Sequence, residues 1–207
     1  MAKARLACYY GVHLGLRTPR ALRPVFVAGR MFVLMETVVV KGVKGAALFS
    51  MDGRYRYALS RKFTTDEASS ICQFIMLNPS TADGDVDDPT VARCIKYAKR
   101  WGHDGLVVTN LFAWRATDPR DLYSAVDPFG DNNRSFVLYT ALQPAVQRVV
   151  CAWGTHGGYL NAGREMLGEL LDAGVHPQVL KWTKDFHPAH PLYLPGDLEP
   201  FDAEVSS

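Results

Sequence analysis

Polar residues that could take part in catalysis or binding are concentrated in four segments. Each segment follows an apolar, strand-like run. The segments begin at Asn78, Asn110, Trp153 and Thr183. Carboxylates orient water or bind cations, amides read hydrogen-bonding edges, and histidine exchanges protons near neutral pH. Such groups at the ends of neighbouring strands predict one shared site.

The segment 78–88 supports two interpretations that stay open. In the first, Asn78 and Ser80 hold a substrate while Asp83 or Asp85 orients a water molecule. In the second, carboxylates bind Mg²⁺ or Ca²⁺ through oxygen. The four carboxylates of this second set are Asp83, Asp85, Asp87 and Asp88. Their spacing lacks the glycine and the distal glutamate of a calcium-binding helix–loop–helix, so no residue is assigned as a metal ligand while the second interpretation stays open.

The segment 110–119 offers an amide, a cation and aromatic rings. Asn110 could hydrogen-bond to a ligand's amide edge, Arg115 could meet a phosphate or carboxylate, and Phe112 or Trp114 could stack on a base. In the competing interpretation, Asp118 caps a short helix and pairs with Arg115, while the aromatic rings fill the core.

The segment 153–158 is rich in glycine. Gly154 would let the backbone approach a ligand closely and present N–H groups to an anion, so we place Trp153 and Gly154 at the substrate. No Lys follows at the spacing of a nucleotide-binding P-loop.

The last segment, 183–193, contains two His-Pro pairs, at His187 and His190. A proline after each histidine favours an extended backbone. We select His190 as a candidate catalytic residue because it follows the final predicted strand, where α/β sheets place their ligands. The His-x-x-His spacing lacks the glutamate-bearing helix of zinc enzymes, so no metal is predicted here either.

These segments need a sheet to bring them together. Residues 36–61 are expected to form an antiparallel hairpin, and the rest of the chain alternates strands with helices. Strands are predicted at 73–77, 106–109, 148–153 and 178–182, and helices at 87–101, 132–142 and 159–173. Alternation of this kind indicates a three-layer α/β/α domain with a mostly parallel central sheet and an N-terminal hairpin. The site then lies beyond the carboxyl ends of the strands.

Composition restricts the possibilities further. The chain has 207 residues, a length that suits one domain, which we place at 36–207. Residues 1–35 form a basic segment that we leave outside the predicted fold, because an Arg-rich, acid-free start resembles a transit peptide. Lys and Arg outnumber Asp and Glu by twelve to two in residues 1–62 and are outnumbered eleven to nineteen in 63–207. The four cysteines form no C-x-x-C pair, which favours a cytoplasmic location, and no apolar run suits a membrane span.

Several motifs, in the same order, resemble the domain of unknown function 1643 (DUF1643). The resemblance spans 46–195 and depends on the motifs at 50–61, 76–83, 87–94, 110–119, 151–154 and 190–193. The chain departs from that family at Phe186, where glycine is usual.

The order of the motifs is also similar to that of the uracil-DNA glycosylase superfamily. That similarity implies hydrolysis of an N-glycosidic bond in nucleic acid or a nucleotide, without a cofactor. His190 would face the base carbonyl, Asp83 or Asp85 would orient water, and Asn110 would read the base. Arg115 and the basic residues Arg54, Arg56 and Arg61 would engage phosphates. Two alternatives stay open: a metal-dependent nucleotide or phosphoester hydrolase, and a non-enzymic nucleotide- or nucleic-acid-binding module.

Overall fold

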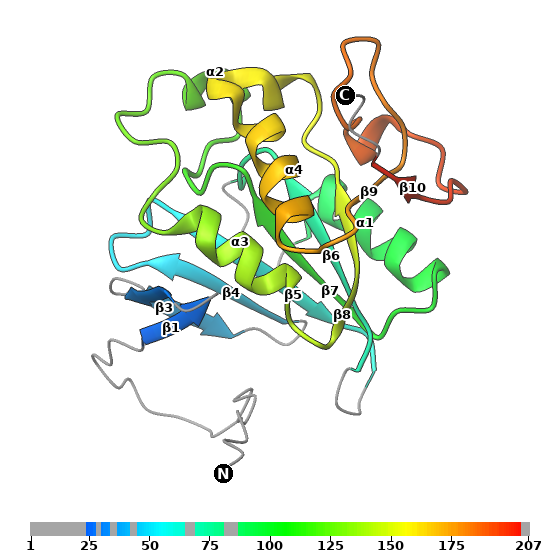
Figure 1. The fold of residues 1–207 in the computed structure, drawn as a ribbon, viewed down its shortest axis with the longest axis horizontal. Coiled ribbons are helices and arrows are strands. Elements are labelled where there is room, and N and C mark those ends of the chain that lie inside the picture. The colour runs from blue at the N-terminus through cyan, green and yellow to red at the C-terminus, as the bar shows by residue number, and fades with distance from the viewer. Residues whose placement is uncertain are drawn as a thin grey trace.

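The computed structural model describes residues 24–27, 30–33, 37–41, 45–64, 69–80 and 87–203. Its centre is an eight-stranded sheet in the order β10-β9-β8-β6-β7-β5-β4-β3 (Figure 1). The strands are β3 (Thr37–Lys41), β4 (Gly45–Ser50), β5 (Arg56–Lys62), β6 (Ile71–Met76), β7 (Gly105–Asn110), β8 (Val146–Cys151), β9 (Gln178–Val179) and β10 (Phe201–Asp202). The short strands β1 (Pro24–Val27) and β2 (Arg30–Val33) pair separately.

The sheet is mixed, so the expectation of a mostly parallel sheet is wrong. Only β7, β6, β8 and β9 run parallel, whereas β3, β4, β5 and β10 pair antiparallel with their neighbours. Crossover helices allow parallel pairing between 71 and 179. Only three residues separate β3 from β4 and only five separate β4 from β5, and connections this short allow only antiparallel pairing. The expected hairpin at 36–61 is therefore present as part of a three-stranded meander.

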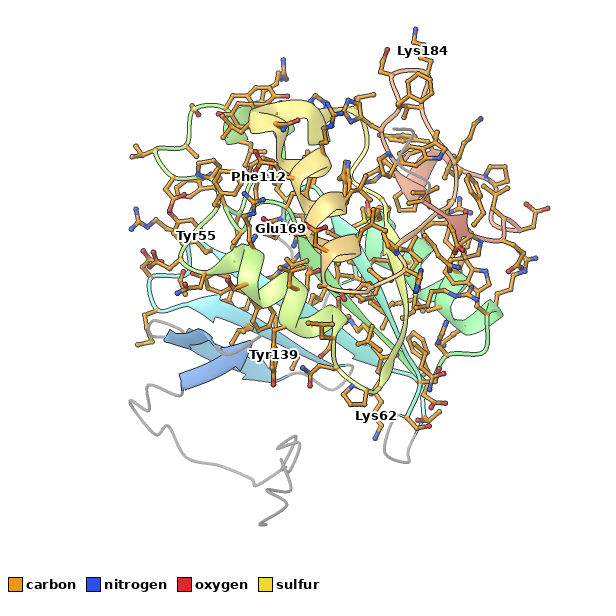
Figure 2. All side chains as sticks on the ribbon, in the orientation of Figure 1. Tyr55, Lys62, Phe112, Tyr139, Glu169 and Lys184 are labelled. Carbon is orange, nitrogen blue, oxygen red and sulfur yellow. The ribbon has the colours of Figure 1, made fainter. Side chains whose placement is uncertain are left out.

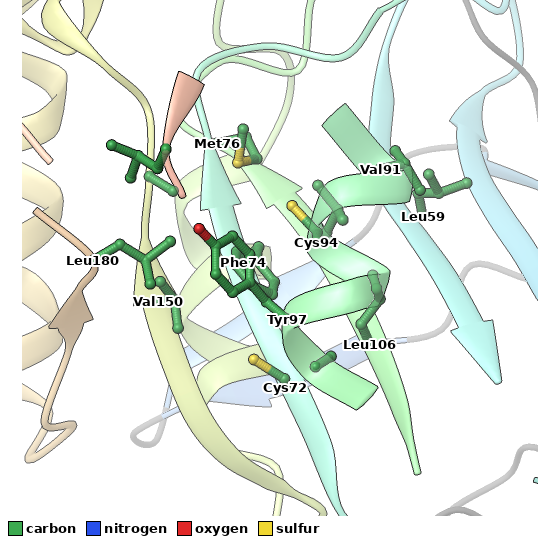
Figure 3. Packing of buried hydrophobic residues seen from close by; sticks show 14 of the residues in the cluster. Leu59, Cys72, Phe74, Met76, Val91, Cys94, Tyr97, Leu106, Val150 and Leu180 are labelled. Atoms are coloured by element: carbon green, nitrogen blue, oxygen red, sulfur yellow. The ribbon is translucent and has the colours of Figure 1, made fainter. Parts of the chain in front are cut away.

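Apolar residues on alternate positions of β6 enter two different cores. Cys72, Phe74 and Met76 pack with helix α1 (Pro89–Arg100), whereas Ile75 and the following Leu77 belong to the opposite core. Figure 3 shows the first of these cores beneath α1. Because both faces of β6 are covered, its residues are apolar on both faces, with Gln73 as the one polar exception, and they do not alternate with exposed polar residues.

The second core lies under helices α3 (Asn133–Ala141) and α4 (Ala162–Asp172). Figure 1 shows these two helices on the same face of the sheet. Between β8 and α4, the 3₁₀ segment η1 (Thr155–Asn161) ends at Leu160 and Asn161, both with positive φ. This backbone reversal places the start of α4 three residues later than predicted.

Helix α1 begins where its sequence predicts. The side chain of Asp88 accepts a hydrogen bond from the Val91 N–H at 2.7 Å, and Pro89 occupies the first turn. No helix among the described residues is long and apolar enough to cross a membrane. Residues 1–23 lie outside the described part of the chain.

Candidate functional site

A cavity of about 560 Å³ lies at the edge where β6 and β7 end, and all four polar segments contribute to its lining. Six of the predicted site residues line it: Asn78, Ser80, Asn110, Trp153, Gly154 and His190. The volume falls within the range of small-molecule pockets. The structure therefore brings together residues that are separated by more than a hundred positions in the chain.

Three predicted residues are not found at the cavity. Asp83 and Asp85 lie outside the described residues. Arg115 is described but does not line the cavity, because its guanidinium donates to the Gly53 carbonyl at 2.8 Å and lies 5.0 Å from the centre of the Phe49 ring. Its predicted partner Asp118 pairs with Arg120 instead. The proposed role of Arg115 in substrate binding is thus not supported by its position.

Asn110 presents a buried amide to the cavity. The residue is 1% exposed, and its Nδ2 has no hydrogen-bond partner among the described residues. A buried polar group without a partner costs about 1–3 kcal/mol, so such groups are rare unless a ligand or water satisfies them. The amide nitrogen of Asn110 therefore makes no hydrogen bond that supports the fold among the described residues.

Asn133 fixes the backbone at this point, and the sequence analysis did not identify it. Its Nδ2 donates to the carbonyls of Asn110 and Leu111 at 2.9 and 3.0 Å, which ties α3 to the end of β7. No local signal indicates this contact, because Asn at the start of a helix ordinarily satisfies that helix's own N–H groups.

His190 is held in a defined protonation state. It caps the short 3₁₀ helix η2 (Pro191–Tyr193), where its Nδ1 accepts the Leu192 N–H at 3.4 Å. A neutral ring that accepts at Nδ1 carries its proton on Nε2. Burial lowers the pKa of His190 from its ordinary 6.5, although the carboxylate of Asp88 opposes the shift. His190 therefore offers a neutral Nε2–H donor at neutral pH.

The described polar residues of the segment 78–88 already make hydrogen bonds or ion pairs within the protein. The Asn78 Nδ2 donates to the Ala116 carbonyl at 2.8 Å, which leaves its oxygen Oδ1 as the group available to a ligand. Asp88 accepts from the Ser80 hydroxyl at 2.8 Å as well as capping α1, and Asp87 pairs with Arg61 at 2.7 Å. Among the residues that the structure describes, no three acidic, His or Cys side chains form a metal-binding group.

Arg56 adds a cation to the cavity wall. It is 2% exposed, and its N–H donates to the Ala113 carbonyl at 2.9 Å, so β5 is fixed against the segment that follows β7. Burial lowers the pKa of Arg56 to about 10, a shift opposed by Asp88, and the guanidinium remains charged at neutral pH. Lys62 lies at the other end of β5 from Arg56. Figure 2 shows that Lys62 and Lys184, which belongs to the last polar segment, lie on opposite sides of the molecule.

Trp153 and Gly154 form a further part of the cavity lining. The indole of Trp153 packs over Gly157 and next to Gly163, so this side chain belongs to the second core rather than to a stacking surface. Gly154 has φ +74° and donates its N–H to the Pro188 carbonyl at 2.7 Å, beside His190. Phe112 is likewise buried in the second core, as the packing interpretation expects.

The loop that leads to His190 carries an exposed aromatic residue. Phe186 is 81% exposed and has φ +56°, a left-handed conformation that favours glycine. Its backbone N–H nevertheless donates to the Thr183 carbonyl, which closes the turn. The departure from the expected glycine thus changes the side chain presented by the loop without opening the turn.

The family model described as "Protein of unknown function (DUF1643)" matches residues 56–192. The match starts at Arg56 and includes both Asn110 and His190, so it covers every described lining residue of the cavity except Tyr193 and Leu194. The chain belongs to this family. Comparisons with the curated proteins and with the solved structures find no match.

Proposed function

We propose that the protein hydrolyses the N-glycosidic bond of a nucleobase-containing substrate bound in this cavity. The observation that carries the proposal is the pairing, in one cavity, of the unsatisfied Asn110 amide with the Nε2–H donor of His190. An amide is complementary to a base edge that presents a donor beside an acceptor. A fixed N–H donor is complementary to a carbonyl oxygen that becomes more negative as the base departs.

The proposed reaction needs few protein groups. The bond between the sugar C1′ and the base nitrogen breaks, and its electron pair stays on the base, where the His190 Nε2–H stabilises the developing charge. The oxygen of a water molecule attaches to C1′. One proton from that water ends on the departing base. Asp83 or Asp85, in the segment between Ser80 and Asp87, would orient the water, and the Asn78 Oδ1 could accept its second proton in a hydrogen bond.

The three-layer arrangement of the glycosylase superfamily is part of the same proposal. It is supported by α1 on one face of the sheet and α3 and α4 on the other. The position of the cavity at the carboxyl ends of β6 and β7 also agrees with it.

Release of free base from nucleosides, nucleotides and oligonucleotides, measured by chromatography with EDTA present, tests the proposal. We expect His190→Gln to reduce the rate by about 10²-fold or more, because it removes the fixed donor to the leaving base. Release of phosphate that EDTA abolishes would instead establish the metal-dependent alternative. Binding with no base release from any substrate would establish the non-enzymic alternative.

Asn110→Leu separates recognition from folding. We expect ligand binding to fall at least tenfold while the midpoint of thermal unfolding stays the same or rises, because the replaced amide makes no hydrogen bond within the described protein. The measurement is a ligand titration beside a thermal melt. A large loss of stability would show that the amide serves the fold, contrary to the proposal.

A further inference from the structure

The arrangement of charge around the cavity restricts the form in which a substrate can bind. Arg56 is the only Lys or Arg among the described residues that line the cavity, and it lies buried in the wall. Four of the described lining residues are exposed to solvent, and none of them is a lysine or arginine: Thr117, Thr155, His156 and Tyr193. A polynucleotide keeps its phosphates outside a base-sized pocket and needs cations on the surrounding surface.

The N-terminus of α1 lies beside Arg56. Thr90 and Val91, in the first turn of this twelve-residue helix, line the cavity together with Arg56. A helix N-terminus carries a partial positive charge that favours anions. The Asp88 carboxylate faces both Arg56 and His190, but the Ser80 hydroxyl and the Val91 N–H each donate to it.

Asn110 gives independent evidence that this cavity is built for a ligand. It lines the same cavity, is 1% exposed, and has an unpartnered amide nitrogen. The amide and the guanidinium belong to β7 and β5, which are adjacent strands of the sheet. A base at Asn110 and an anionic group at Arg56 would therefore occupy neighbouring parts of one cavity.

We infer that the substrate is a free nucleoside 5′-monophosphate, which enters the cavity whole and places its phosphate at Arg56 and the first turn of α1. The inference rests on the proposed function for the base at the other end of the ligand. The negative balance of residues 63–207, eleven cations against nineteen acids, also favours a small ligand over a polynucleotide.

Calorimetric titration of nucleosides, of their 5′-monophosphates and of ribose 5-phosphate tests the inference on the full chain. We expect each monophosphate to bind at least tenfold more tightly than its nucleoside. Arg56→Gln should abolish that difference while leaving nucleoside affinity unchanged, and Arg56→Lys should keep part of it. Arg115→Gln is the matched control, since Arg115 lies outside the cavity lining, and it should retain the full difference.

Equal affinity for nucleosides and monophosphates would overturn the inference, as would oligonucleotides that bind more tightly than monophosphates irrespective of residue 56. The same experiment separates the inference from the proposed function. Monophosphate binding that depends on Arg56 without base release would retain the inference and refute the hydrolysis. Base release from oligonucleotides alone would refute the inference and retain the hydrolysis.

Discussion

At the scale of single residues, His190 shows how its surroundings determine its chemistry. The ring caps η2 through Nδ1, so its proton lies on Nε2, and burial favours the uncharged form. Asn110 shows the complementary case, in which a buried amide is kept without a protein partner. The lowered pKa of His190 and the unpartnered amide nitrogen of Asn110 both follow from burial by neighbouring residues.

Stability should depend on pH through the buried histidines. Burial lowers the pKa of both His190 and His103, with Arg148 adding to the shift at His103. The unfolded chain therefore binds protons more readily, so the free energy of unfolding should be constant above pH 6.5 and fall as the pH drops below it. Urea unfolding between about pH 5 and 8, with His190→Gln and His103→Gln, measures this dependence.

His190→Gln and His103→Gln should each reduce the fall in the free energy of unfolding below pH 6.5. His176→Gln is the control, because its side chain is exposed, and it should leave the slope unchanged. Hydrogen bonds from Ser69 and Ser70 lower the pKa of the Asp104 carboxyl from its ordinary 3.8, so this group does not contribute to the slope in this window. A slope that neither histidine variant changes would contradict the prediction.

At the scale of elements, the fit of α4 against the sheet depends on a glycine. A Cβ at Gly163 would lie 2.6 Å from the Trp153 Nε1 and 2.9 Å from the Gly157 carbonyl oxygen, whereas a Cβ at Gly168 meets nothing within 4 Å. Both residues lie in α4. The same substitution can therefore be compared at a crowded and at an open position of one helix.

We expect Gly163→Ala to lower the free energy of unfolding by about 1–3 kcal/mol, because the added methyl group displaces Trp153 or the η1 backbone. Gly168→Ala should raise it by up to about 1 kcal/mol through helix propensity alone. Chemical denaturation of the two variants beside the parent protein measures both effects. Equal effects at the two positions would show that the predicted crowding is absent.

The elements also show which parts of the molecule were predictable. Strands β6 and β7 are largely apolar and are followed by polar segments, so Asn78, just beyond β6, and Asn110, the last residue of β7, could be located from the sequence. From the sequence, Arg56 is a basic residue that would engage phosphates, with no indication that its side chain is buried. It is buried because the cavity wall and the segment after β7 cover β5. That burial, like the reach of Asn133 to β7, depends on contacts between distant segments.

At the scale of the whole molecule, three cysteines report on global unfolding. Cys72, Cys94 and Cys151 are at most 1% exposed, and burial raises the pKa of each thiol. The thiolate is the reactive form, so these groups should be inert in the folded protein. Cys8 lies outside the described residues and is best replaced by serine.

In a Cys8→Ser background, we expect no maleimide labelling of the native protein and three equivalents once urea unfolds it. A ligand of the cavity should slow labelling near the transition, because binding to the folded state alone stabilises it. Mass spectrometry of the labelled chain gives the count. Rapid native labelling would mean that the two cores open locally, contrary to the burial described above.

The cavity takes its walls from Arg56 near the beginning of the described sheet and from His190 to Leu194 near its end, with β8 and β9 added in between. No shorter stretch of chain contains both walls. A polypeptide growing on the ribosome therefore lacks the complete pocket until Leu194 has emerged, so a ligand can assist folding only after that point.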